Sequence, residues 1–412
     1  SEKETTTTSA PPAAAAASTG SSDPLITVAY LAIVGVWGLS QFVLVPYIVH
    51  LLVLVMGILY VACHGSLMLR EEPPAEGEEG YDPDAVPVET LRKEDAQMFP
   101  ILGSCSLFGL YCAFKFLGQD LVNLLISGYF AAVGCGALTM TIAPIAEKIA
   151  PKSMNEKEIG WKKEISHPLP DWFMPSPVEV GVVFTLTEWA SFFLSAGIVG
   201  LYFKTRYWAL NNVLGICFCI QGIERLSLGT YWIGAILLIG LFFYDIFWVF
   251  GTDVMVTVAK NLDGPIKLLF PRSLTPDEVT GRIELSLLGL GDIVIPGFFL
   301  ALLLRFDAHN ANMPTTNINI HQNFSKPYFH SAMIAYFLGL GTTLFVMIQF
   351  RAAQPALLYL VPACLGSSFL CAVVRGEVTE LLAYSEEVEE EEEEQEEGDE
   401  NKEKNDDDKK KD

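Results

Sequence analysis

The chain has 412 residues, of which 51% are hydrophobic and only 18% are charged, and its mean hydropathy is positive. Its net charge of −23 could indicate an acidic surface that recruits basic partners. However, 19 acidic and five basic residues lie between Glu377 and Asp412, so most of the charge belongs to one short region. The composition excludes an ordinary soluble enzyme and favours a protein that crosses a membrane several times.

Apolar runs long enough to cross a bilayer recur along the chain. The first, at 25–45, follows a tail rich in Thr, Ala, Ser and Pro at 1–24, and only Pro46 separates it from the second run. It could be a separate span, a re-entrant piece or the start of one long bent helix. Nine further runs are expected to form core helices, at 47–69, 98–117, 121–145, 178–203, 207–224, 231–256, 283–306, 329–350 and 354–374.

These runs predict an all-α fold, a polytopic transmembrane helix bundle with nine core helices at 46–375 and an extra apolar segment at 25–45. The stretch at 376–412 should be a disordered acidic tail, because it lacks the apolar residues needed to bury a core. The eight cysteines and six histidines show no ligand spacing, and no phosphate loop or nucleic-acid motif occurs. We therefore expect the lipid bilayer as surroundings, with no metal, no cofactor and no nucleic acid.

The basic residues of the connections predict the orientation, because Lys and Arg collect in cytosolic loops. With the C-terminus in the cytosol, counting from the run at 47–69 puts 17 Lys and Arg residues in cytosolic segments and 8 on the other side. The ending Lys409-Lys410-Lys411-Asp412 also matches the dilysine signals that return membrane proteins to the endoplasmic reticulum, although a charged tail can end in lysines by chance. A cytosolic C-terminus would leave the sequon Asn323-Phe324-Ser325 without a glycan.

Two acidic residues lie inside apolar runs, Asp245 in "FFYDIFWVF" and Asp292 in "LGLGDIVIPG". Asp245 precedes Met255, the expected end of its span, by ten residues, or ~15 Å of helix rise. Asp292 follows Ile283, the expected start of the next span, by nine residues, or ~13.5 Å. Because consecutive spans run in opposite directions, the two carboxyl groups should lie at one depth and meet.

Two carboxyl groups in contact cannot both ionise easily, so one stays protonated while the other is anionic. Such a pair can polarise a carbonyl group and deprotonate a water molecule together, as in aspartic proteases. A buried acid can also simply pair with a Lys or Arg, but neither span carries a basic residue near its middle. The sequence therefore favours Asp245 and Asp292 as a catalytic pair.

The neighbouring residues fit this chemistry. Gly289 and Gly291 remove side chains from the approach to Asp292, and Pro296 should loosen the helix beyond it. Tyr244 could donate a hydrogen bond near the site, although a tyrosine that only packs there is about as plausible.

At these residues the chain closely resembles the signal peptide peptidase family of intramembrane aspartyl proteases, which is related to presenilin. The family's Tyr-Asp motif is Tyr244-Asp245, its Gly-x-Gly-Asp motif is Gly289-Leu290-Gly291-Asp292, and its Pro-Ala-Leu motif is Pro355-Ala356-Leu357. The resemblance covers roughly Met98 to Leu382. Three motifs in the family's order are specific, whereas Gly-x-Gly-Asp alone would be weak.

The resemblance implies nine transmembrane helices, a lumenal N-terminal side, a cytosolic C-terminus and a place in the endoplasmic reticulum membrane. It implies cleavage of residual signal peptides and type II oriented transmembrane segments, with Asp245 and Asp292 as catalytic residues. Pro355, Ala356 and Leu357 would lie beside the site and position the substrate. A homo-oligomer and partners from endoplasmic reticulum quality control are compatible with such an enzyme.

Three questions stay open at this point. If the segment at 25–45 spans the membrane, the family's lumenal N-terminus does not apply to this chain. Asp253, where relatives tend to have a neutral residue, could be an interfacial acid or could tune the pair. Two rival functions also remain, a non-catalytic scaffold that binds signal peptides and a proton-coupled transporter, since intramembrane carboxylates also relay protons.

Overall fold

The computed structural model describes the following residues: 23–67, 89–91, 93–155, 157–165, 178–252, 254–262, 264–273, 283–311, 313, 323–350 and 354–386. The polar tail expected at 1–24 lies almost entirely outside these ranges, as do Asp253 and the part of the acidic tail after Glu386.

The described chain is mostly helical, which confirms the predicted all-α class. The long helices are α1 (Pro24–Leu39), α2 (Tyr47–Gly65), α3 (Lys93–Phe116), α4 (Gln119–Ile149), α6 (Leu186–Thr205), α7 (Trp208–Arg225), α8 (Tyr231–Phe250), α10 (Gly291–Asn310), α11 (Pro327–Phe350) and α12 (Leu357–Arg375). The short helices are α5 (Lys152–Asn155), α9 (Val254–Asn261) and α13 (Val378–Ala383).

The described strands form three small two-stranded sheets. β1 (Glu89–Thr90) is parallel to β4 (Leu226–Ser227), while β2 (Glu158–Ile165) is antiparallel to β3 (Val178–Thr185) and β5 (Lys267–Pro271) to β6 (Leu285–Gly289). The last of these hairpins matters most for function, because β6 leads directly into α10.

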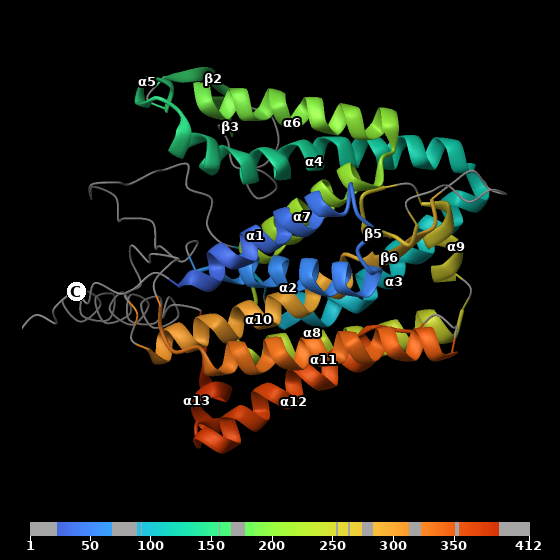
Figure 1. The fold of residues 1–412 in the computed structure, drawn as a ribbon, viewed down its shortest axis with the longest axis vertical. Helices are drawn as coiled ribbons and strands as arrows, with labels where there is room; N and C mark the ends of the chain where they lie inside the picture. The colour runs from blue at the N-terminus through green and yellow to red at the C-terminus, as the bar shows by residue number, and fades with distance from the viewer. Residues whose placement is uncertain are drawn as a thin grey trace, which may run out of the picture.

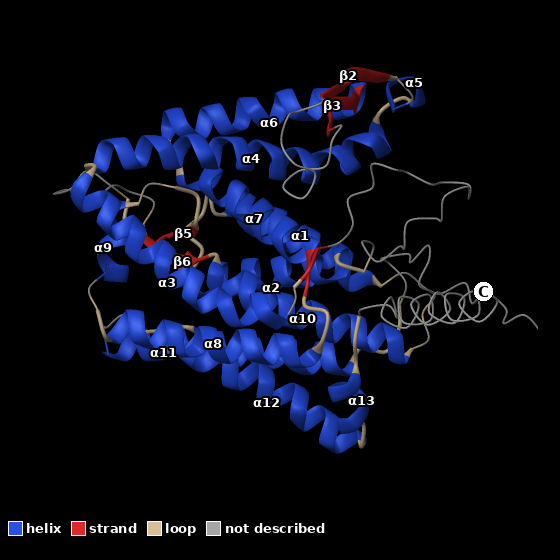
Figure 2. Cartoon of the chain, turned by 180° about the vertical axis from the view of Figure 1, so that it is seen from behind, coloured by secondary structure: helices blue, strands red, loops and turns tan. Residues whose placement is uncertain are grey.

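Figure 1 shows α4 and α6 side by side along one edge of the bundle, α12 towards the opposite edge, and α2 and α10 between them. Figure 2 shows the same order from behind. α10 contacts α2, α7, α8, α11 and α12, and most of its residues are buried. It is the central helix around which the others pack.

In the described part of the chain, seven helices are long and apolar enough to cross a membrane by length and composition: α2, α3, α4, α6, α8, α11 and α12. The remaining two predicted core spans, α7 and α10, are also helical but carry polar residues. Because α10 is surrounded by protein, groups such as Arg305 and Asp307 avoid the lipid. The central position of α10 explains why hydropathy alone does not select it.

α1 folds back along α2 as an antiparallel hairpin. At one end Asp23 caps α1, and its carboxylate accepts hydrogen bonds from Tyr60 near the end of α2 and from Lys326. At the other end, the Trp37 indole N–H donates to the carbonyl oxygen of Ala209 at the start of α7, at 3.1 Å. The segment expected at 25–45 is therefore a separate helix that runs alongside the core, not a continuation of α2.

Three expected boundaries are wrong in the same way, because apolar runs contain strands or turns as well as helix. The run at 178–203 begins as β3, and the run at 283–306 contains β6 before α10 starts at Gly291. The run at 231–256 divides at Gly251, where α8 ends and α9 follows. Hydropathy measures burial, and a strand buried in protein is as apolar as a helix.

The acidic tail also begins later than the predicted boundary at residue 376. α13 follows α12 directly, Leu381 and Tyr384 are buried, and Ser385 forms a bridge with Thr230. The folded core therefore extends at least to Glu386, because this segment carries apolar side chains that the rest of the tail lacks.

Candidate active site

Asp245 lies on α8 with 5% of its surface exposed. Its Oδ2 accepts a hydrogen bond from the backbone N–H of Leu357, at 3.1 Å. Leu357 is the first residue of α12, where backbone N–H groups have no partner within the helix, and the N-cap residue Ala356 has no side-chain oxygen to offer. The Asp245 carboxylate therefore supplies the cap that the sequence of α12 lacks.

Asp292 is the second residue of α10 and is half-buried. The hairpin of β5 and β6 delivers it: Gly289 is opposite Lys267 in the register, and the N–H of Leu290 donates to Ile266 at 3.0 Å. A Cβ on Gly289 would lie 3.4 Å from Oδ2 of Asp292. The backbone of β6 thus passes close to the carboxyl group, and any larger side chain at Gly289 would reach it.

The two acids lie on helices that pack against each other, because α8 and α10 are in contact. Direct contact between the two carboxyl groups stays a prediction. Asp245 is five residues from the end of α8 and Asp292 one residue from the start of α10, so both acids are nearer the helix ends than expected.

The Pro-Ala-Leu segment lies at the site, because Leu357 contacts Asp245 and all three residues, Pro355, Ala356 and Leu357, are buried. Tyr244 is half-buried against Gly103 of α3. Among the described residues, no group of three or more His, Cys, Asp and Glu could hold a metal ion.

Comparison with known proteins adds an independent observation. Residues 84–388 match the family model described as signal peptide peptidase. The chain belongs to the signal peptide peptidase family. It is 42% identical to the signal peptide peptidases of Homo sapiens and Mus musculus, over 72% of this chain and 74% of each relative. It is also 36% identical to a probable intramembrane protease of Schizosaccharomyces pombe, over 73% of this chain and 85% of the relative.

Membership of the signal peptide peptidase family supports intramembrane proteolysis as the activity, and the apolar helices agree with a multi-pass membrane protein. The family model covers α3 through α13 and therefore both acids and the Pro-Ala-Leu segment. α1 and α2 lie before the matched residues, although Asp23 and Tyr60 hydrogen-bond each other and Asp23 binds Lys326 within the matched region.

Sequence reasoning missed several polar residues that the structure brings together. Only 2% of Arg305 is exposed, and it forms an ion pair with Glu386 at 2.7 Å. Asp307 accepts hydrogen bonds from the first N–H groups of α11. Tyr336 of α11 contacts the backbone of Asp292. The charges within "LLLRFD" could have drawn attention to Arg305 and Asp307, but no pattern in the sequence pointed to Tyr336.

Proposed function

We propose that the protein is an intramembrane aspartic endopeptidase in which Asp245 and Asp292 share one proton. The observation that carries this proposal is the packing of α8, which carries Asp245, against α10, which carries Asp292, inside an apolar bundle. Repulsion between two carboxyl groups disfavours ionisation of both. Membership of a protease family supports the same conclusion.

The surroundings divide the roles between the two acids. The N–H of Leu357 favours the carboxylate form of Asp245, so the shared proton resides on Asp292. Asp245 then takes a proton from water while the oxygen of that water bonds to the scissile carbonyl carbon, and Asp292 gives its proton to the carbonyl oxygen. When the tetrahedral intermediate collapses, the C–N bond breaks and the proton on Asp245 passes to the leaving nitrogen, while one hydroxyl of the intermediate returns a proton to Asp292 and becomes the new carbonyl oxygen.

Substrates are proposed to be residual signal peptides and type II oriented transmembrane segments. The backbone groups of such helices are hydrogen-bonded internally, so cleavage requires local unwinding. The region from Val256 to Arg282 is proposed to admit or pair with the unwound segment, and its described part contains most of α9 and all of β5. Because β5 holds β6 beside Asp292, deleting this region should abolish cleavage; cleavage that survives the deletion would contradict its role.

The proposed location is the endoplasmic reticulum membrane, with the C-terminus in the cytosol. Asp23, the end of α2 and the start of α11 meet through hydrogen bonds, so these segments share one face of the bundle. Glu386 lies on the same face, because Arg305 joins it to Ser66 at the end of α2. The N-terminal end of α1 is therefore proposed to lie on the same, cytosolic side of the membrane as Glu386. This departs from the lumenal N-terminus that the family resemblance implied.

Purified protein in liposomes with a labelled signal peptide tests the proposal. The native chain should release peptide fragments, and Asp245→Asn or Asp292→Asn should each abolish their release. A scaffold would bind the peptide without turnover in every version, and a transporter would move protons without forming fragments. Fragments released by either Asn variant at the native rate would refute the aspartic mechanism.

A further inference from the structure

Pro296 interrupts the hydrogen bonding of α10 next to the proposed catalytic residue. In an α-helix the carbonyl oxygen of residue i accepts from the N–H of residue i+4. For Asp292 that residue is Pro296, which has no N–H. The first turn of α10 therefore lacks the bond that would ordinarily fix the peptide group of Asp292.

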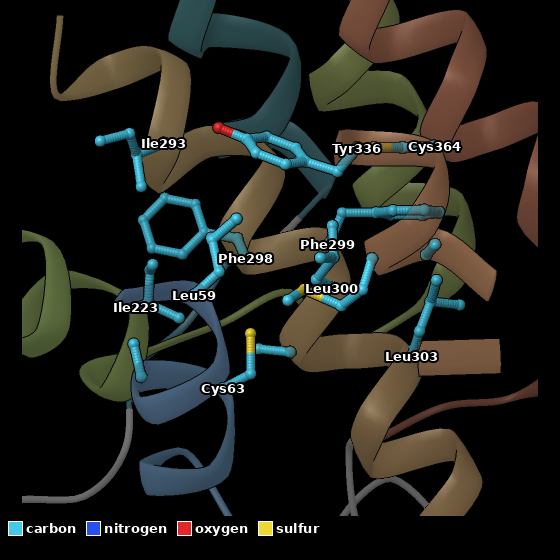
Figure 3. Packing of buried hydrophobic residues seen from close by; sticks show 14 of the residues in the cluster. Leu59, Cys63, Ile223, Ile293, Phe298, Phe299, Leu300, Leu303, Tyr336 and Cys364 are labelled. Carbon is cyan, nitrogen blue, oxygen red and sulfur yellow. The ribbon is translucent and has the colours of Figure 1, made fainter. Parts of the chain in front are cut away.

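A tyrosine from another helix supplies a donor at this position. The hydroxyl of Tyr336 donates to the carbonyl oxygen of Asp292 at 3.1 Å, across 44 positions in the sequence. Tyr336 is fully buried, so no bulk water competes for the hydroxyl. Figure 3 shows its ring lying beside α10, with the oxygen directed towards the part of the helix that carries Ile293.

α11 is itself firmly located. Gly339, three residues after Tyr336, packs against α12 so closely that a Cβ there would lie 3.2 Å from the carbonyl oxygen of Tyr359. α12 in turn begins at Leu357, whose N–H binds Asp245. Two packed helices thus contribute one hydrogen bond to each acid, to the carboxylate of Asp245 and to the backbone of Asp292.

We propose that Tyr336 is a positioning residue, whose hydroxyl replaces the N–H missing at Pro296 and so fixes the orientation of Asp292 towards Asp245. The inference rests on the proposed aspartic mechanism. It states which further residue the mechanism needs and why the helix can contain a proline at this place. Tyr336 touches the backbone of Asp292 and does not itself contact the scissile bond.

The test is a double-mutant cycle measured with the labelled signal peptide in liposomes. Tyr336→Phe keeps the ring and removes the hydroxyl, and it should lower kcat roughly tenfold with little change in KM, the size expected for one lost hydrogen bond. Pro296→Ala restores an N–H four residues after Asp292. In the Pro296→Ala background, Tyr336→Phe should therefore change kcat less than about twofold.

Tyr231→Phe is the matched control. Its hydroxyl is also buried and lies 3.0 Å from Ser368 Oγ, between α8 and α12, so the same group is removed without touching Asp292. Its kcat should stay near that of the native chain. If Tyr336→Phe fails to fold, folding restored by Pro296→Ala supports the inference, and a double variant that also fails to fold overturns it.

An equal loss of kcat from Tyr336→Phe in both backgrounds, or no loss in either, would overturn the positioning role while leaving the mechanism intact. The mechanism itself fails on a different result, the cleavage retained by Asp245→Asn or Asp292→Asn.

Discussion

The two ends of α10 hold buried polar residues under opposite conditions. At its start, Asp292 lies on a helix that packs against α8, which carries another acid, Asp245. At its far end, Arg305 pairs with Glu386 and donates to Ser66 Oγ at 3.0 Å, and it also binds Ser227.

Asp307, two residues after Arg305, accepts the N–H of Phe329 at 2.8 Å and that of Tyr328 at 3.3 Å. Both ends of one helix therefore carry ionisable groups, but among the described residues only those at the far end are paired with an opposite charge. A buried group that is paired in this way stabilises one packing, whereas two acids on adjacent helices favour the exchange of a proton. In this bundle the partners of a charged group, more than its burial, distinguish a structural group from a proposed catalytic one.

The largest expected effects follow from replacing the acid at each end of α10 with asparagine. Asp292→Asn should lower cleavage on the order of 10⁴-fold, because Asn cannot give a proton to the carbonyl oxygen. It should leave the thermal midpoint equal or higher, because no acid then has to stay protonated near Asp245. Asp307→Asn, at the far end, should keep cleavage within a few-fold and lower the midpoint. Cleavage and the thermal midpoint are measured for both variants. If Asp307→Asn abolished cleavage and Asp292→Asn lowered the midpoint, the proposed difference between the two ends of α10 would be wrong.

The next largest effect concerns the ion pair itself. Arg305→Met should destabilise the bundle by about 3–5 kcal/mol, because it takes the opposite charge away from the buried carboxylate of Glu386. The double variant Arg305→Met with Glu386→Leu should recover most of that loss. Denaturant unfolding in detergent measures both. If the double variant were as unstable as Arg305→Met alone, the ion pair would stabilise the fold by more than the neutralisation of its two charges.

A second cluster, in which Asp23 pairs with Lys326 and Tyr60, attaches α1 to the rest of the bundle. Burial raises the pKa of Asp23, but the hydrogen bond and charge of Lys326, with the N–H of Leu25, lower it more, so the pKa lies below its ordinary value of 3.8. Asp23 therefore stabilises the fold above about pH 4, and its contribution is lost as the pH falls through the folded-state pKa.

Asp23→Asn should cost about 1–3 kcal/mol at neutral pH and have a much smaller effect well below pH 3.8. Unfolding measured at both pH values checks this. Trp37→Phe, which removes the hydrogen bond at the opposite end of α1, is the control and should show no such pH dependence. A pH-independent cost of Asp23→Asn would contradict the electrostatic attachment.

The smallest expected effect concerns the two glycines beside Asp292 at the start of α10. Gly289→Ala would place a methyl group 3.4 Å from the Asp292 carboxyl oxygen, so cleavage should fall roughly two- to fivefold with no change in unfolding. Gly291→Ala would meet only Ile295 of its own helix, at 3.7 Å, and should stay within about twofold of the native chain. If both variants lowered the cleavage rate equally, proximity of the new methyl group to the Asp292 carboxyl group would not explain the loss.

The sequence predicted the helical class and placed Asp245 and Asp292 on consecutive helices that the structure packs together, because hydropathy and the scarcity of intramembrane acids are properties of single segments. It could not predict that β6 precedes Asp292, since Leu285–Gly289 is as apolar as the helix that follows. Whether such a run is strand or helix depends on its pairing with β5, a contact that hydropathy does not encode.

Partners distant in the sequence were equally beyond prediction. Arg305 meets Glu386 across 81 positions, and Tyr336 meets the Asp292 carbonyl across 44, and neither contact leaves a local pattern. The motifs identified the acids because each contains its acid. The groups that orient those acids lie on α11 and α12, and only packing brings them there.

The hairpin of α1 and α2 has a practical consequence for cell biologists. Since Asp23 and Glu386 emerge from one face, epitope tags attached near either residue would report the same compartment. One protease-protection experiment on intact microsomes then tests whether both tags are accessible to added protease. If one tag were digested and the other protected, this hairpin would not form in cells.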